Sequence, residues 1–209
     1  MNKITIQGII KDIEFSHYIN DIEYYKANVV VKRENDKEDI IPIKFKRFCN
    51  TYKDGEEVLF TGNVRTFSTH HEDGKNHVIP YVFTYFDKVE LKDEEGNDLE
   101  LKSRNFVQLD GNICKKGELR KTKTGLDVID FIIANNIKNK NSTFNTYLPV
   151  VAWGKQAKQI AKMNVSDYVN IEGHFSSRVY KKPNGENFDL KIAYEINVDN
   201  IIEGQWNFY

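Results

Sequence analysis

Apolar and polar residues alternate in short runs along most of the chain, and these runs predict β-strands with one buried face. Five such runs follow one another in the second half, at residues 107–113, 126–135, 147–153, 167–175 and 188–196. Residues 154–164 differ, because their apolar side chains recur every three to four positions with lysines between them. This spacing predicts a short amphipathic helix. The order predicted is three strands, a helix and two further strands.

The first half contains the same pattern in a diverged form. Four residues recur in the second half at one common offset: Val58 and Val169, Gly62 and Gly173, Gly74 and Gly185, Asn76 and Asn187. Two upstream pairs follow with a shift of a few residues: Gly8 and Gly111, Pro42 and Pro149. Self-similarity at this period indicates a tandem repeat. A polar, acidic stretch separates the copies, which predicts a first domain at residues 1–92, a linker at 93–104 and a second domain at 105–209.

About 100 residues with five strands, and one helix between strands three and four, is typical of the OB fold, a small closed barrel. A glycine within the first strand of each copy suits the bend that curls a long strand around such a barrel. A β-sandwich is the alternative, and a helix at the same place in both copies favours the barrel. The predicted fold class is all-β, with two tandem OB-fold five-stranded barrels, each carrying a short helix between strands three and four.

Composition and charge narrow the classes of protein that fit. The 209 residues are 40% hydrophobic and carry a net charge of −1, with no apolar run long enough for a membrane-spanning helix. The N-terminus shows no signal-peptide pattern, and Cys49 and Cys114 fall in different halves, so we expect a cytoplasmic protein without disulfides. Residues 1–102 carry a net charge of −5 and residues 103–209 a net charge of +4. The second half is therefore the one suited to phosphates.

The second half resembles the bacterial single-stranded-DNA-binding protein (SSB) family, whose members are OB-fold proteins. The similarity covers residues 105–201 and begins with GNICKKGELRKTKTGLDVIDFIIA at 111–134, which has a first-strand glycine, an "ELR-x-T" loop and an alternating second strand. VVAWGKQA at 150–157 and VNIEGHFSSRVY at 169–180 resemble the family's third and fourth strands. The resemblance implies sequence-independent binding of single-stranded DNA. In the first half, residues 9–31 lack the "ELR-x-T" motif.

Binding single-stranded DNA without sequence preference requires aromatic faces for the bases and cations for the phosphates. The matched motifs place Tyr147, Trp153 and Tyr180 at the family's stacking positions, and Phe144 is a substitute for a fourth. Strand aromatics more often belong to the core. Here Tyr147 and Trp153 share one strand face while Leu148, Val150 and Ala152 occupy the other, which favours an exposed role.

Candidate cations lie in the first loop of the second repeat, after Trp153 and on the last hairpin: Lys115, Lys116, Arg120, Lys121, Lys123, Lys155, Arg178, Lys181 and Lys182. Each could equally be a solvated turn residue, and Arg120 could brace the loop. In the first repeat, Lys44, Lys46, Arg47, Phe45, Phe48 and Phe67 could form a similar surface, although buried Phe with exposed Lys is the simpler interpretation there. Trp206 more often caps a barrel or an interface.

No motif for an enzyme, a cofactor or a metal is present. The histidines at 70, 71 and 77 cluster without a usual zinc spacing, and we find no P-loop or catalytic constellation. We therefore expect a non-enzymatic protein with no catalytic residues, no metal and no cofactor. An OB-fold accessory or protein-interaction module with weak nucleic-acid binding is the alternative, and an OB nuclease is a distant third.

The expected partner is single-stranded DNA. Four OB folds form the family's working unit, so the resemblance implies a possible homodimer. The printed sequence ends soon after its last strand, at IIEGQWNFY, without the family's flexible linker and acidic tip. We therefore expect neither recruitment of other proteins through an acidic tail nor a membrane partner.

Overall fold

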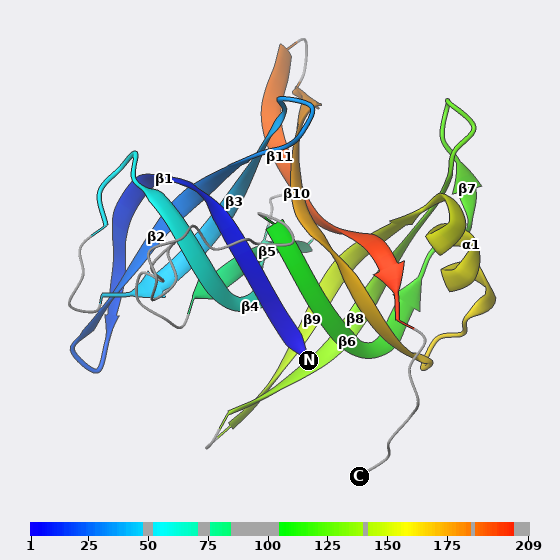
Figure 1. The fold of residues 1–209 in the computed structure, drawn as a ribbon, viewed down its shortest axis with the longest axis horizontal. Helices are drawn as coiled ribbons and strands as arrows, with labels where there is room; N and C mark the ends of the chain where they lie inside the picture. The colour runs from blue at the N-terminus through cyan, green and yellow to red at the C-terminus, as the bar shows by residue number, and fades with distance from the viewer. Residues whose placement is uncertain (48–51, 71–75, 85–104, 140–141, 185–186, 203–209) are drawn as a thin grey trace, which may run out of the picture.

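The computed structural model describes residues 1–47, 52–70, 76–84, 105–139, 142–184 and 187–202. These residues form eleven strands, paired in a single sheet system, and one helix (Figure 1). The first half contains β1 (Asn2–Ile19), β2 (Ile22–Lys32), β3 (Glu38–Lys46), β4 (Glu57–His70) and β5 (Asn76–Thr84). The second half contains β6 (Asn105–Lys116), β7 (Arg120–Lys121), β8 (Asp127–Asn139), β9 (Ser142–Trp153), α1 (Gly154–Lys162), β10 (Tyr168–Asn184) and β11 (Asn187–Ile201).

Strand pairing in the first half closes on itself. β1 pairs with β2, β2 with β3, β3 with β5, β5 with β4, and β4 again with β1. All these pairings are antiparallel except β3 with β5, which is parallel. The result is a ring of five strands whose inward side chains form the core, among them Ile6, Val29, Ile43 and Phe60, which are at most 1% exposed.

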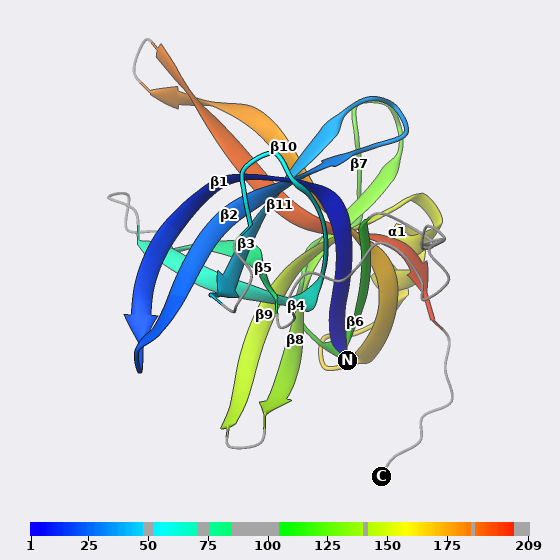
Figure 2. The same ribbon diagram turned by 60° about the vertical axis from the view of Figure 1, so that its left-hand side comes forward.

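The second half repeats this circuit strand for strand. β6 pairs with β8, β8 with β9, β9 in parallel with β11, β11 with β10, and β10 with β6. The short β7 adds to the edge of β8. Figures 1 and 2 show the two rings side by side, with the β10–β11 hairpin rising as a long arm.

The hydrophobic pattern placed all five major strands of the second repeat correctly, and the structure extends their ends. The helix predicted at 154–164 is observed at Gly154–Lys162, with Ala157 and Ile160 buried. The corresponding helix of the first repeat was predicted between β3 and β4, where residues 48–51 lie outside the described residues. The described part of that connection contains a turn at 54–55.

One pair of equivalent glycines, Gly8 and Gly111, helps to explain why the repeat is visible in the sequence. In β1, Gly8 pairs with β4, and the next residue pairs with both β4 and β2. In β6, Gly111 pairs with β10, and the next residue pairs with both β10 and β8. A Cβ atom on either glycine would lie 2.3 Å from a backbone carbonyl oxygen of the neighbouring strand, so only glycine permits this approach. The register shifts of these strands fall a few residues later, after Lys11 and Ile113.

The two repeats are joined through backbone hydrogen bonds between their first strands. β1 and β6 are antiparallel neighbours, with Ile4 opposite Val107 and Ile6 opposite Asn105. The strand order therefore runs from one ring into the other without a break. At the start of each of these strands, an asparagine side chain forms the hydrogen bonds to a neighbouring strand. Asn2 donates to the Val64 carbonyl and accepts from the Val64 N–H, and Asn105 does the same with Phe175.

A second contact between the repeats is polar and buried. The Asp39 carboxylate, on β3, is 1% exposed and accepts hydrogen bonds from Arg33 Nε at 2.7 Å and from the Ser177 backbone N–H at 2.7 Å. The Ile40 N–H donates to Ser177 Oγ at 2.7 Å, and Arg33 Nη2 donates to the Ser177 carbonyl at 3.3 Å. These bonds fix the β2–β3 hairpin of the first repeat against β10 of the second.

Replacing Gly173 by alanine tests the close approach of β10 and β11. The added Cβ would lie 1.9 Å from the Asn197 carbonyl oxygen, so the two strands would have to separate. We expect Gly173→Ala to lower the free energy of unfolding by about 3 kcal/mol, measured by chemical denaturation. The control is Gly117→Ala, whose Cβ would lie 3.2 Å from one carbonyl oxygen, with an expected effect below about 1 kcal/mol. Equal effects would contradict this account.

Candidate nucleic-acid interface

The outer face of β9, β11 and β10 carries the aromatic residues that the sequence singled out. In β9, Leu148, Val150 and Ala152 are at most 1% exposed and point into the core. Successive side chains of a strand alternate between its faces, so Tyr147 and Trp153 point outward, as the pattern predicted. They lie roughly 20 Å apart along the strand. Tyr147 is 52% exposed and Trp153 is partly buried.

Trp153 is fixed at its edge by a chain of hydrogen bonds. Its indole Nε1 donates to Asn197 Oδ1 at 2.7 Å, and Asn197 Nδ2 donates to Ser176 Oγ at 2.5 Å. Asn197 and Ser176 are 8% and 5% exposed, which makes their bonds stronger than bonds in water. The indole ring is therefore held in one orientation at the end of β9.

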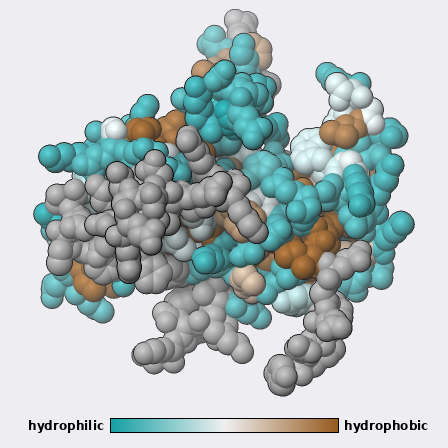
Figure 3. Space-filling model, viewed as in Figure 1, coloured by the Kyte–Doolittle hydropathy of each residue, from teal (hydrophilic) through white to brown (hydrophobic). Residues whose placement is uncertain are grey.

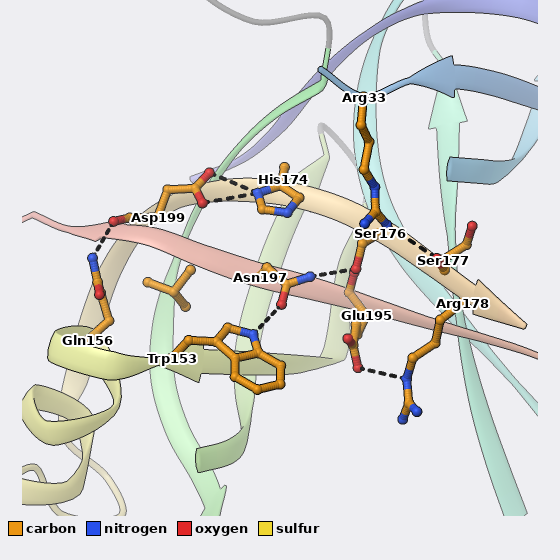
Figure 4. A pocket seen from close by; sticks show the side chains of 11 residues that line it. Arg33, Trp153, Gln156, His174, Ser176, Ser177, Arg178, Glu195, Asn197 and Asp199 are labelled. Carbon is orange, nitrogen blue, oxygen red and sulfur yellow. Dashed lines mark hydrogen bonds and ion pairs between the residues drawn. The ribbon is translucent and has the colours of Figure 1, made fainter. Parts of the chain in front are cut away.

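A cavity of about 520 Å³ opens beside this indole (Figure 4). Its lining includes Arg178 and Glu195 from the β10–β11 arm and Arg33 from the first repeat. At one end, His174 Nδ1 lies 3.0 Å from both carboxylate oxygens of Asp199. The volume lies within the range of small-molecule pockets in proteins. Residues of both repeats therefore line this cavity, which we call the junction cavity.

Several lining residues lie outside the motifs, among them Arg33, Glu195 and Asn197. Arg33 lies in the first repeat, in a segment without any motif, and no local signal connects it to Trp153. Glu195 and Asn197 alternate with buried Ile196 and Val198 along β11, so their outward direction could have been read from the strand pattern. Their proximity to Trp153 follows from the parallel pairing of β11 with β9.

The β10–β11 arm carries the second group of expected residues. Arg178 is exposed, and its Nε lies 3.9 Å from Glu195 Oε2. Tyr180, two residues further on the same face, is 37% exposed. Lys181 Nζ lies 5.8 Å from the centre of the Phe188 ring across the hairpin. Figure 3 shows the arm standing clear of the body, with mostly hydrophilic residues on the side facing the viewer.

The cations of the first loop divide into paired and exposed residues. Arg120 forms an ion pair with Asp130, and Lys121 Nζ lies 2.9 Å from Asp127 Oδ1. The hydrogen bond from Lys121 is the main cause that holds the pKa of Asp127 below its ordinary value. Both contacts link the ends of the β7–β8 hairpin. Lys115 and Lys123 are exposed.

Lys116 has a structural partner. Its Nζ donates to the Ala161 carbonyl at 3.0 Å and to the Met163 carbonyl, at the C-terminal end of α1. A cation is favoured at this end of a helix, where the backbone carbonyls have no partner within the helix. The ammonium group therefore stabilises the end of α1.

The remaining expected residues are only partly described. Lys155 is exposed in the first turn of α1. The backbone of Phe144 belongs to β9 opposite Ile137, and that of Lys182 to β10 opposite Asp189. The side chains of Phe144 and Lys182 lie outside the described residues, as does Trp206.

The first repeat has a separate surface of cations and aromatic rings. Lys44 Nζ lies 5.0 Å from the ring centre of Phe67 and 4.8 Å from that of Tyr81, beside a cavity of about 210 Å³. Burial, with a smaller effect of Lys26, lowers the pKa of Lys44. Lys46 lies 5.8 Å from the Tyr24 ring.

Other residues considered for this surface are placed elsewhere. Phe45 is 7% exposed and belongs to the core, as the simpler interpretation held. Arg47 Nη1 lies 2.7 Å from Glu23 Oε2, and Phe48 lies outside the described residues. In the described part of the chain, no three His, Cys, Asp or Glu residues are grouped as metal ligands would be. The helix found there is also too short to cross a membrane.

Sequence comparison identifies the family. The single-strand binding protein family matches residues 104–202. A single-stranded DNA-binding protein of Clostridium tetani (strain Massachusetts / E88) is 30% identical over 106 residues, which cover 49% of this chain and 71% of that protein. The chain belongs to the single-strand binding protein family. It therefore belongs to a family of OB-fold proteins that bind single-stranded DNA.

Structural similarity extends over the whole chain. The crystal structure of the wild-type single-stranded DNA binding protein from Thermus aquaticus aligns with a TM-score of 0.69 at 14% identity, covering 100% of this chain and 95% of that one. A deletion mutant of the same protein aligns with a TM-score of 0.67 at 16% identity, covering 100% and 97%. At this identity the likeness concerns the fold, and it includes the first repeat, which the family match leaves out.

Lys116→Met tests whether this lysine acts on the helix. Removing the ammonium group leaves the carbonyls of Ala161 and Met163 without that donor, and we expect a loss of about 1–2 kcal/mol in the free energy of unfolding. Lys115→Met is the matched control, because Lys115 is exposed next to it, and we expect a change below about 0.5 kcal/mol. Chemical denaturation of both variants measures the two free energies of unfolding. A smaller loss for Lys116→Met than for the control would refute the assignment.

Proposed function

We propose that the protein binds single-stranded DNA without requiring a fixed sequence, through base stacking on Trp153, Tyr180 and Tyr147. The observation that carries this proposal is the outward-facing, edge-fixed indole of Trp153 beside a cavity, within the part of the chain that the family matches. Every base has a π-face, so stacking tolerates any sequence. Phe144 is a further stacking candidate on β9.

The phosphates would follow exposed cations of the second half of the chain. The proposed set comprises the exposed Lys115, Lys123, Lys155 and Lys181, together with Lys182. Arg178 also belongs to the proposed DNA contacts, and it lines the cavity, where it can meet a base or a phosphate. Arg120 and Lys121 are assigned mainly to bracing the β7–β8 hairpin, because both are paired with carboxylates. Lys116 is assigned to the helix end. The positive charge of the second half supports this path.

We also propose that the two closed rings are tandem OB barrels, at residues 1–92 and 105–209, joined by a linker at 93–104. The circuit of pairings, with one parallel contact between third and fifth strands, supports this in both halves. In the first repeat, Lys44 with Phe67 and Tyr81 offers a cation between rings. A DNA strand bound mainly to the second barrel could continue onto this surface of the first barrel.

Fluorescence titration with labelled oligo(dT) tests the binding. We expect a Kd below about 1 µM at moderate salt, weaker binding as salt rises, and quenching of tryptophan emission. Trp153→Ala removes one stacking platform and should raise Kd about 5- to 150-fold, which corresponds to roughly 1–3 kcal/mol per base. Tyr18→Ala is the control, because Tyr18 is 62% exposed near the tip of the β1–β2 hairpin, and its Kd should stay within about twofold of the wild type.

Three outcomes would contradict the proposal. A Kd no tighter than about 10 µM would favour the accessory or interaction module. Equal losses for Trp153→Ala and Tyr18→Ala would remove Trp153 from the site. Shortening of the oligonucleotide in the presence of Mg²⁺ would indicate a nuclease.

A homodimer would bring together four OB folds, the number that works together in this family. We expect a solution mass of about twice the 24.4 kDa of the chain, measured by light scattering with and without a long dT strand. A monomer in both conditions would contradict the dimer while leaving DNA binding intact.

A further inference from the structure

Charges around the junction cavity largely cancel. Arg178 and Arg33 contribute two cations, and Glu195 and Asp199 contribute two carboxylates. The charge of Arg33 is also paired with the buried Asp39 at 2.5 Å. A phosphate gains most where positive charge is in excess, and this cavity has no such excess. The balance of charge therefore favours a neutral, polar ligand over a phosphate.

A base is the neutral part of a DNA strand, and the cavity offers it a flat wall. The Trp153 indole lies beside Glu195 and Asn197 in Figure 4. The polar groups of Asn197 are already engaged, because it accepts from Trp153 and donates to Ser176. Asn197 therefore orients the indole, and Glu195 and Arg178 are left to meet the edge of a stacked base.

The Glu195 carboxylate has unused capacity to accept hydrogen bonds. Its side chain is 19% exposed, and its ion pair with Arg178 Nε is 3.9 Å long, beyond hydrogen-bond distance. Burial is the main cause that raises its pKa, opposed by Arg178. A largely buried carboxylate gains from any donor that reaches it, since its lone pairs have given up most of their water.

We propose that this junction cavity is a base subsite in which Glu195 accepts a hydrogen bond from an exocyclic amino group. Cytosine, adenine and guanine carry such a group, whereas thymine and uracil present a carbonyl oxygen at the corresponding position. In amino bases an acceptor lies next to the amino group, within reach of the Arg178 guanidinium. A carbonyl oxygen facing Glu195 would instead meet a second acceptor. The inference deepens the proposed function and rests on it: the strand as a whole binds by stacking, and one position is biased towards amino bases.

Cytosine and uracil give the sharpest comparison, because they have the same ring size and differ at the amino position. Homopolymers of dC and dU of about 16 nucleotides place the same base in the cavity in every register. Intrinsic differences in stacking affect wild type and variants alike. The quantity to measure is therefore the ratio of Kd for dU to Kd for dC, obtained by fluorescence anisotropy.

Glu195→Gln should lower this ratio about 3- to 10-fold, because the amide can donate to uracil as well as accept from cytosine. Loss of the negative charge affects both homopolymers equally and cancels in the ratio. Glu172→Gln is the matched control: Glu172 lies on β10, accepts from Gln108 at 3.3 Å and does not line the cavity. The control removes the same charge and should leave the ratio unchanged.

The outcomes separate this inference from the function on which it rests. Tight binding of both homopolymers with the same ratio in wild type and Glu195→Gln overturns the base subsite alone. An equal change in Glu172→Gln also overturns it, because the effect would then come from charge and not from the cavity. Failure of wild type to bind either homopolymer overturns the proposed function itself. Melting curves of both variants verify that they are folded.

Discussion

Backbone hydrogen bonds between β1 and β6 hold the two repeats in one continuous sheet, and the junction cavity depends on this pairing. β6 is bonded to β1 along one edge and to β10 along the other. The first repeat is thereby placed next to the arm of the second, where its β3 meets β10. Without the shared sheet, Arg33 could not reach the cavity that contains Trp153. The pairing thus makes one composite surface out of two similar rings.

The buried carboxylate of Asp39 fixes the position of this contact. It is 1% exposed, and burial of an unpaired charge would cost several kcal/mol. Arg33 and the Ser177 backbone N–H satisfy it, and the hydrogen bond that Arg33 donates to Asp39 raises the pKa of Arg33 in turn. Such a network contributes little net stability compared with apolar packing, but it is satisfied in one geometry only. It therefore determines where the β2–β3 hairpin lies on β10.

Most of the fold could be predicted from local sequence, because strand alternation and helix spacing are local properties. The start of the helix followed from the spacing of its apolar residues, and the outward direction of Tyr147 and Trp153 followed from strand alternation. The glycines at 8 and 111 indicated equivalent positions in the first strands of the two repeats, and both strands switch partners there. The partners of cations could not be predicted in this way. Lys116 resembled its neighbour Lys115 in sequence, yet it meets a helix end 45 residues away.

The candidate site was predictable to the extent that it lies within one repeat. Trp153, Arg178 and Tyr180 stand in recognisable motifs on β9 and β10, which both pair with β11. Arg33 stands in none, since its place beside the cavity depends on the contact of two rings separated by a long connection. Glu195 alternates with core residues, and only the parallel pairing of β11 with β9 brings it near an indole. Which residues line the site is therefore determined by pairing between strands that are distant in sequence, and not by residue type alone.

The balance of charge inside the cavity also differs from the net charge of the half of the sequence that supplies most of its lining. The second half carries a net charge of +4, and its exposed lysines on the first loop, on α1 and on the arm do not line the cavity. Inside the cavity, arginines and carboxylates occur in equal number. Under the proposed function, a strand would keep its phosphates on exposed cations outside the cavity, where water and ions also reach them, and turn a base towards the indole. Phosphates and bases would occupy different places for a physical reason. A phosphate would lose hydration in a cavity that has no excess of positive charge, whereas a base would gain stacking and a hydrogen bond there.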